Sequence, residues 1–184
     1  QSYTNAAEQG LAFKNTCNEY YEVYQEGIYV GYRYYETRYE DTVLGNANVG
    51  KYDYASTVAY PFGYGLTYGD VVVTSLSYDD GKVNVEVENN GADTCDVIEL
   101  YIKSHCDNAP AYPVLCGFKR IFVKKCEKLD VEIEIPDKAF STVSDIGERK
   151  QFAKEFTLYV GTHQPDELSC QLSGTNCMSI EIER

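Results

Sequence analysis

The chain has 184 residues, of which 43% are hydrophobic, so it can bury the core of one domain and carry an additional segment. Its formal net charge is −13 and it has no Lys- or Arg-rich cluster, which argues against nucleic acid or an anionic membrane as a partner. No apolar run approaches the roughly 20 residues that a membrane-spanning helix requires.

The first 69 residues are rich in tyrosine and hold 14 of the 18 tyrosines of the chain. Helix is expected only at residues 5–14. Between residues 27 and 35, side chains alternate in the manner of an extended strand, and both sides of that strand need a covering partner. We predict that residues 1–69 form an extended, tyrosine-rich arm and linker. The predicted contact residues of this arm are Ile28, Tyr29, Val30, Tyr32, Arg33, Tyr34 and Tyr35.

Residues 70–184 show the pattern of β-strands repeatedly. Residues 82–88 and 128–135 alternate apolar and charged side chains, as expected of strands with one face on a core and one in water. Asp79-Asp80-Gly81 is a typical hairpin turn between residues 71–78 and 82–89. The fold class is therefore all-β, an antiparallel immunoglobulin or fibronectin type III-like β-sandwich. Further strands are expected at residues 97–103, 117–123, 156–160 and 178–183.

The chain has seven cysteines, which is many for a protein in a reducing compartment. They lack the closely paired spacing of a zinc site, and only two histidines are present, so no metal site is expected. We therefore predict that these cysteines form disulfides, which implies a secreted, extracellular protein.

Three bridges are predicted from the positions of the cysteines. If residues 96–103 pair with residues 118–125, one register places Cys95 opposite Cys126 and Cys106 opposite Cys116. Cys170 and Cys177 close a short loop before the last strand. The seventh cysteine, Cys17, is left either for an intermolecular bridge or as a buried free thiol.

Two tyrosine-dense blocks precede the predicted sandwich, Glu26-Gly-Ile-Tyr-Val-Gly-Tyr-Arg-Tyr-Tyr-Glu36 and Tyr60-Pro-Phe-Gly-Tyr-Gly-Leu-Thr-Tyr68. They resemble the segment that, in glycoside hydrolase family 3 β-glucosidases and β-xylosidases, leads from the α/β sandwich domain into the C-terminal fibronectin type III-like domain. Glu99-Leu-Tyr-Ile102, residues 115–123 and residues 156–161 follow in the order of that family. The resemblance covers residues 20–163 and implies a linker over residues 1–69 and a sandwich over residues 70–184.

The resemblance does not extend to the catalytic parts of that family. There, the nucleophile is an aspartate of an N-terminal barrel, and the acid/base residue lies upstream of the segment seen here. No position of this chain matches either motif. The resemblance therefore implies no catalytic residue, no enzyme activity of the chain itself and no cofactor.

Two functions are compatible with these features. The first is a secreted structural protein that self-assembles into a homo-oligomer or filament, with the arm of one copy packing on the sandwich of the next. In the opposing interpretation, the arm folds back on its own sandwich. The alternative function is an accessory or carbohydrate-binding module, or a fragment, of a family 3 glycoside hydrolase, with a polysaccharide stacked on its tyrosines.

Overall fold

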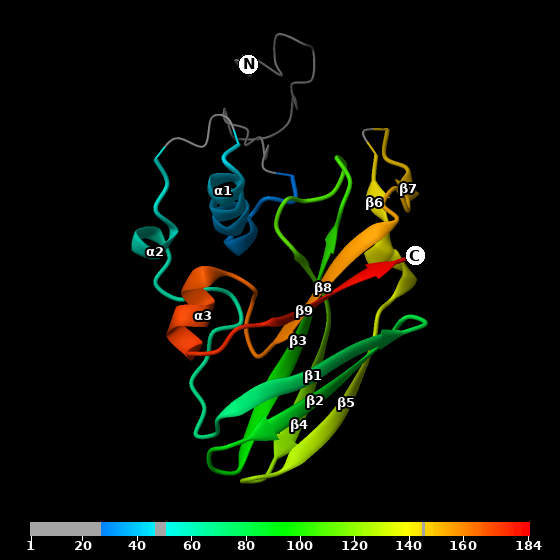
Figure 1. Cartoon of the computed structure of the whole chain (residues 1–184). Helices are drawn as coiled ribbons and strands as arrows, with labels where there is room; N and C mark the ends of the chain where they lie inside the picture. Colours follow the sequence, from blue (N-terminus) through cyan, green and yellow to red (C-terminus); the bar gives the residue numbers. More distant parts are fainter. Residues whose placement is uncertain (1–26, 47–50, 145) are drawn as a thin grey trace, which may run out of the picture.

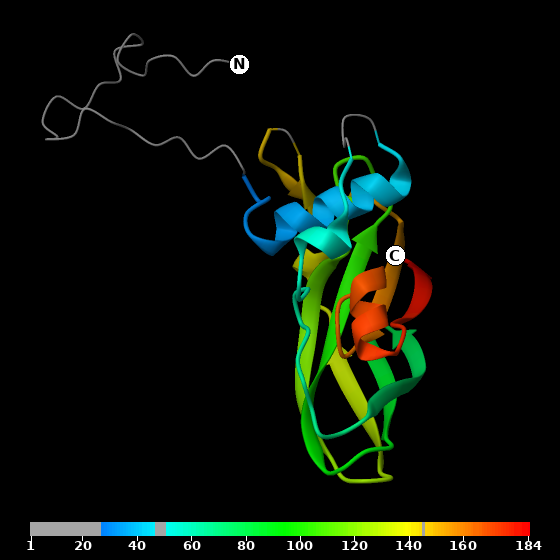
Figure 2. The same ribbon diagram turned by 90° about the vertical axis from the view of Figure 1, so that its left-hand side faces the viewer.

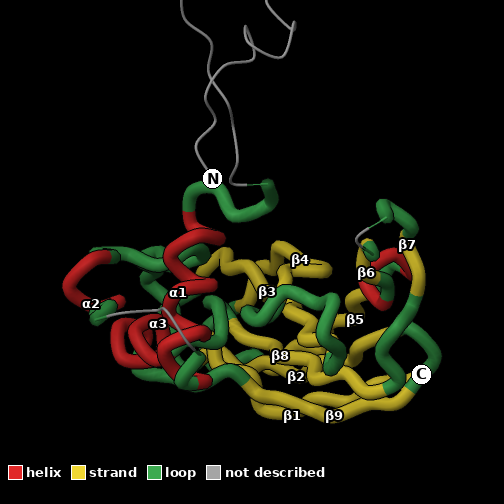
Figure 3. Tube along the Cα trace, turned by 90° about the horizontal axis from the view of Figure 1, so that it is seen from above, coloured by secondary structure: helices red, strands yellow, loops and turns green. Residues whose placement is uncertain are grey.

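The structure is a computed structural model that describes residues 27–46, 51–144 and 146–184. Figure 1 shows two packed layers of strands, and Figure 3 shows most of the helical segments gathered on one side of them. In the described part of the chain, no helix is long and apolar enough to cross a membrane. The helix expected at residues 5–14 lies outside the described residues.

All strand pairs among the described residues are antiparallel, and they form two principal sheets and one small hairpin. The first sheet has the order β1-β2-β5, with β1 Val71–Asp79, β2 Lys82–Asn89 and β5 Lys128–Glu134. The second has the order β4-β3-β8-β9, with β4 Val114–Val123, β3 Thr94–Ser104, β8 Glu155–Gly161 and β9 Met178–Glu183. The small hairpin joins β6 Thr142–Val143 to β7 Arg149–Lys150.

Helices are short and lie outside the sheets. They are α1 Tyr32–Leu44, α2 Tyr54–Thr57, the 3-10 helix Asp137–Phe140 and α3 Glu167–Ser173. The predicted all-β sandwich is thus confirmed, and each predicted strand is present within a few residues of its expected bounds.

The hairpin between β1 and β2 forms where the sequence predicts it. Asp79 pairs with Lys82, which leaves a two-residue turn of Asp80 and Gly81. Their φ angles are 41° and 83°, and such left-handed residues match the twist of the flanking strands.

The core lies between the two sheets and consists mainly of aliphatic side chains. Alternate residues of β2 are buried in it, as the period of two in the sequence predicts. In β3, Ile98, Leu100 and Ile102 belong to the core, and the residues between them, Glu99 and Tyr101, are buried as well. Full burial of an aliphatic side chain is worth about 1.5–3 kcal/mol. The central members are Val83, Val85, Val87, Ile98, Leu100, Val123, Val131, Phe156, Leu158 and Val160.

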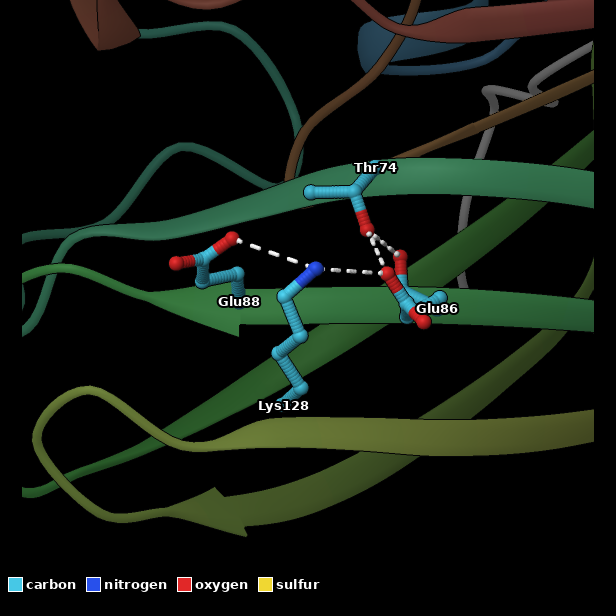
Figure 4. A network of polar contacts seen from close by, with 4 residues as sticks. All are labelled: Thr74, Glu86, Glu88 and Lys128. Carbon is cyan, nitrogen blue, oxygen red and sulfur yellow. Dashed lines mark hydrogen bonds and ion pairs between the residues drawn. The ribbon is translucent and has the colours of Figure 1, made fainter.

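The outer face of the β1-β2-β5 sheet is polar. Lys128 lies 3.1 Å from Glu86 and 3.6 Å from Glu88, and Thr74 donates to Glu86 over 2.8 Å (Figure 4). These side chains are partly exposed to solvent, and exposed pairs of this kind contribute little to stability. The network therefore indicates a face that is turned to solvent.

The pairing of β3 with β4 is as predicted, but the predicted register is wrong. Cys95 lies opposite Phe122, and Leu100 lies opposite Gly117. The register shifts at Leu100 and Tyr101, where one strand carries an extra residue. The register is determined by the inward-facing apolar residues of both strands, because a different alignment would leave these residues without their partners in the core.

The segment that precedes the sandwich is not the extended arm that its alternating pattern predicts. Residues 32–44 form helix α1, which begins after Gly31 and ends at Gly45 in a left-handed conformation with φ of 69°. Gly45 donates its backbone N–H to the last turn of the helix, as is typical of glycine at this position. No Gly or Pro interrupts the 13 residues between, and tyrosine is only weakly unfavourable in helices.

The end of the linker is held by Asn89, whose side chain is completely buried. Its Oδ1 accepts the backbone N–H groups of Asp70 (3.0 Å) and Gly91 (2.9 Å), and its Nδ2 donates to the carbonyl groups of Ala92 and Val123. One amide therefore connects the linker, the β2–β3 loop and the end of β4. This determines where the linker meets the sandwich.

Candidate docking surface around helix α1

Helix α1 lies across one end of the sandwich, above α2 and α3 (Figure 2). Its buried contact is made by Glu36, of which 3% is exposed, on the side that faces the loop between β8 and α3. In that loop the fully buried Gln164 lies within hydrogen-bond reach of Glu36 and donates to the Tyr54 hydroxyl over 3.0 Å. A polar contact therefore joins α1 and α2 to the sandwich.

Burial raises the pKa of Glu36 to about 8, and the neighbouring Asp166 adds to the rise. At neutral pH the folded chain therefore holds Glu36 mainly as the neutral acid. A hydrogen bond from the Gln164 side chain favours the charged form of Glu36 and so opposes the rise in pKa, but its effect is smaller than that of burial.

Further contacts from the same side of α1 reach the sandwich and α3. Tyr39 accepts the backbone N–H of Glu167 over 3.2 Å, and its ring packs on that of Tyr54 at 4.9 Å. Glu40 forms an ion pair with Lys103 near the end of β3. Both charged side chains are mostly buried, so this pair is less screened by solvent than those on the outer sheet face.

The platform under α1 is itself fixed by the cap of α3. Asp166 is buried at the N-cap of α3, where its carboxylate accepts the backbone N–H of Ser169 over 2.9 Å and the Ser169 hydroxyl. This arrangement satisfies a free N–H group at the start of the helix and holds the loop that carries Gln164.

The other side of α1 and the turn before it are open to solvent. Ile28 and Val30 are 53% and 61% exposed in the turn, and Tyr34 is 45% exposed on the helix. All seven residues predicted to form the assembly interface lie in this turn or at the start of α1, and all are exposed, although Tyr32 and Arg33 lie on the helix face that also carries Glu36. The two alternating faces predicted for an extended strand do not form, because the helix period places Glu36, Tyr39 and Glu40 towards the sandwich instead.

The linker after α2 continues this apolar surface. The ring of Tyr32 stacks on Phe62 at 4.4 Å, so the start of α1 and the linker lie side by side. Tyr60 stacks on Tyr64 at 5.3 Å, while Leu66 and Tyr68 are 91% and 93% exposed. The exposed apolar and aromatic residues of the turn, of α1 and of the linker are called the docking surface below. They are Ile28, Tyr29, Val30, Tyr32, Tyr34, Tyr35, Tyr60, Leu66 and Tyr68.

A groove of about 520 Å³ separates the linker from the outer face of the β4-β3-β8-β9 sheet. Its lining includes Asp96, Glu99, Arg120 and His163. The linker crosses the sheet closely at Gly63, where a Cβ atom would lie 2.6 Å from the Glu99 carboxylate. The Tyr101 hydroxyl donates to that carboxylate over 2.7 Å, and burial raises the pKa of Glu99.

The six described cysteines are free thiols in the structure. The observed register removes the reason for the Cys95–Cys126 and Cys106–Cys116 bridges, because Phe122 faces Cys95, and the Cys116 thiol donates to the Leu100 carbonyl over 3.3 Å. Cys17 lies outside the described residues. Among the described residues, no group of three or more His, Cys, Asp or Glu side chains is arranged to hold a metal ion.

The residues that hold α1 in place were not predicted from the sequence. Gly31 and Gly45, on either side of a segment without Gly or Pro, could have indicated the helix. The partners of Glu36 and Glu40 could not have been found in this way, since Gln164 and Lys103 are distant in the sequence and only the fold brings them to α1.

Comparisons with known proteins agree with this architecture. A family model described as a fibronectin type III-like domain matches residues 96–164. The chain is 29% identical over 151 residues to an exo-α-(1→6)-L-arabinopyranosidase of Bifidobacterium breve and 31% identical over 169 residues to a β-glucosidase of Kluyveromyces marxianus. The alignments cover 78% and 86% of this chain and 18% of each relative.

A solved structure of the β-glucosidase from Kluyveromyces marxianus is also similar, with a TM-score of 0.60 and 27% identity over 88% of this chain and 17% of the other. This chain thus spans less than a fifth of the length of these relatives. The resemblance found in the sequence is confirmed: residues 96–164 form a fibronectin type III-like domain, and the chain around them is similar to the part of glycoside hydrolase family 3 β-glucosidases that contains this domain.

Proposed function

We propose that this chain is the non-catalytic accessory part of a family 3 glycoside hydrolase, and that its docking surface packs against the catalytic domains of such an enzyme. The observation that carries this proposal is the contrast between the two sides of α1. The inner side is held on the sandwich by Glu36, Tyr39 and Glu40. By contrast, Tyr34 on the outer side of the helix, and Ile28 and Val30 in the turn before it, are exposed to solvent. Exposed apolar side chains gathered in this way are typical of a protein contact.

The intramolecular contacts of α1 also favour this function over the self-assembly of extended arms. An arm that exchanges between copies would have to make its buried contacts with the neighbouring chain. In this structure the polar partners of α1 belong to the same chain. The function of the chain is then to position the linker and α1 for another domain. Hydrolysis of glycosides is assigned to that other domain.

A chimera tests this proposal. In the chimera, this chain replaces the aligned segment of the Kluyveromyces marxianus β-glucosidase. A truncated enzyme that lacks the segment serves as the reference. The rate at which each protein hydrolyses an aryl β-glucoside is then measured. We expect the chimera to recover much of the activity that the truncation loses. The isolated chain should hydrolyse neither aryl β-glucosides nor aryl β-xylosides between pH 4 and pH 8.

The matched control changes only the docking surface. Ile28, Val30, Leu66 and Tyr68 are replaced by Ser, which leaves the inner contacts of α1 untouched. This variant chimera should show the low activity of the truncated enzyme while its isolated chain keeps the unfolding midpoint of the wild type. Equal activity of the two chimeras would contradict the proposed role of the surface.

Self-assembly remains a second candidate, because the same exposed residues could pack against a second copy of the chain. The mass of the isolated chain in solution distinguishes the two functions. A monomer at high concentration supports the accessory function, whereas an oligomer or filament that the four Ser substitutions disperse supports self-assembly.

We also propose that the protein is secreted, on the basis of its cysteine content. Cleavage of a leader from the precursor tests this proposal.

A polysaccharide partner would find polar groups in the groove under the linker, which Asp96, Glu99 and Arg120 line. Carboxylate and guanidinium groups bind sugar hydroxyls, and the ring of Tyr64 lines the same groove. Titration of cellobiose and xylobiose into the chain, with Arg120→Ala as the comparison, tests this partner. Saturable binding that the substitution weakens is expected if the groove holds sugar.

A further inference from the structure

Two cysteines lie at the ends of the turn that joins α3 to β9, and Figure 1 shows this helix leading directly into the last strand. Cys170 belongs to α3, and Cys177 directly precedes β9. The helix ends at Gly174, whose left-handed φ of 75° and N–H bond to the Cys170 carbonyl (2.9 Å) reverse the chain. The turn therefore brings Cys177 back towards Cys170.

The two cysteines are close neighbours. The backbone N–H of Cys177 lies near the sulfur of Cys170 and lowers the pKa of that thiol, and the Cys170 sulfur is close enough for its charge to raise the pKa of Cys177. The Cys177 thiol donates to the His163 carbonyl over 3.2 Å and lies 3.7 Å from His163 Nδ1. His163 in turn contacts Thr175 in the turn, at 3.2 Å from its carbonyl oxygen.

The surroundings leave room for these sulfurs and hold one of them in place. At Gly161, at the end of β8, a Cβ atom would lie 2.6 Å from the Cys177 sulfur, so the absence of a side chain there makes space for the thiol. Burial raises the pKa of Cys177 to about 12 and also raises the pKa of Cys170. Neither thiol is therefore an activated nucleophile of the kind that enzymes use.

We propose that Cys170 and Cys177 form a thiol–disulfide site, which a low-molecular-weight disulfide such as oxidised glutathione converts to an intramolecular bridge. One thiol attacks glutathione disulfide, forms a mixed disulfide and releases one reduced glutathione. The other thiol then displaces the second glutathione. Two thiols of the protein are oxidised, and the two electrons and two protons leave with the two molecules of reduced glutathione.

The bridge would join the last turn of α3 to the start of β9 and so fix the platform on which α1 rests. Asp166 caps α3, and Glu167 contacts Tyr39 of α1. Oxidation of this pair should therefore stabilise α1 in its position on the sandwich. The inference is independent of the proposed accessory function, since it requires no catalytic domain.

Peptide mapping tests the pair directly. After Lys154 no Lys or Arg occurs until Arg184, so one tryptic peptide, residues 155–184, contains Cys170 and Cys177 and no other cysteine. The folded, reduced protein is incubated with oxidised glutathione, then denatured at acidic pH with N-ethylmaleimide and digested without reduction. The expected product is this peptide with two hydrogens lost and no added maleimide.

The thermal midpoint gives a second measurement. The oxidised protein should unfold roughly 5 °C above the protein kept in dithiothreitol, by the usual effect of a short disulfide loop on a chain of this size. The matched controls are Cys170→Ser, which should abolish this difference, and Cys95→Ser, which should preserve it because Cys95 is exposed on another strand.

Three outcomes of the mapping would overturn the proposal: a peptide 155–184 with two maleimides, one that carries glutathione on each cysteine, or one linked to another peptide. A single Ser substitution that prevents folding does not affect this test, because the mapping uses the wild-type chain.

Discussion

Glu36 of α1 and Gln164 of the β8–α3 loop are both buried and lie within hydrogen-bond reach of each other. Gln164 also donates to Tyr54, so one amide contacts the two helices that precede the sandwich. This contact makes the position of α1 dependent on the protonation of Glu36, because a neutral acid can be buried beside an amide at much lower cost than a carboxylate.

The stability of the chain should therefore fall as the pH rises. The pKa of Glu36 is raised from 4.5 to about 8 on folding, so the folded state binds the proton more tightly than the unfolded state does. The stabilisation is complete below pH 4.5 and is lost as the pH passes through about 8. We expect the free energy of unfolding to decrease by about 3–4 kcal/mol between pH 5 and pH 8, measured by urea denaturation.

Glu36→Gln should remove most of this pH dependence, because the amide can bond to Gln164 and does not titrate. A smaller slope of the same sign should remain, since burial also raises the pKa of Glu99. The control is Glu132→Gln on the outer face of β5, which should leave the slope unchanged. An equally steep slope in Glu36→Gln would show that other groups are responsible.

The ion pair of Glu40 and Lys103 should contribute more to stability than a surface pair. Its side chains are 12% and 21% exposed, whereas those of Lys82 and Glu132, which lie 3.0 Å apart, are each 52% exposed. In a double-mutant cycle with Glu40→Gln and Lys103→Met, we expect a coupling energy of about 1–2 kcal/mol. The equivalent cycle at Lys82 and Glu132 should give about 0.5 kcal/mol or less. Equal couplings would mean that α1 is not held by this pair.

Gly91 should tolerate no side chain, because the linker backbone passes directly over it. A Cβ atom there would lie 2.6 Å from the Asp70 nitrogen and 2.6 Å from the Gly69 carbonyl carbon. Gly91→Ala should therefore destabilise the fold by about 1–3 kcal/mol as the linker is displaced. Gly65→Ala, in the linker itself, is the control: nothing lies within 4 Å of a Cβ atom at Gly65, so the substitution should be neutral or slightly stabilising. Thermal denaturation of the two variants compares them, and similar midpoints would show that the linker does not pack as described.

The sandwich could be predicted from the sequence because its determinants are local. Alternation in β2 and β5 gives the inward residues directly, and Asp80-Gly81 specifies the hairpin. The register of β3 against β4 was wrong because it was inferred from cysteine positions. The extra residue near Leu100 and the apolar residues of the core determine it instead.

The conformation of the segment before the sandwich was harder to predict. From Ile28 to Tyr35, apolar and aromatic residues occur at nearly every position, so both a period of 2 and a period of 3.6 find matches. What selects the helix is tertiary contact. Glu36 finds Gln164 and Glu40 finds Lys103 only when the sandwich has formed, and such long-range partners leave no local signal.

The central claim is that the docking surface on α1 and the linker is covered by the catalytic domains of a family 3 enzyme. Hydroxyl-radical labelling of the isolated chain and of the chimera, followed by mass spectrometry, tests it most directly. We predict that labelling of Tyr34, Tyr60 and Tyr68 falls several-fold in the chimera, while Phe118 on β4 and Ile146 beside β7 remain as reactive as in the isolated chain. Unchanged labelling of the three tyrosines in a folded chimera would contradict the claim.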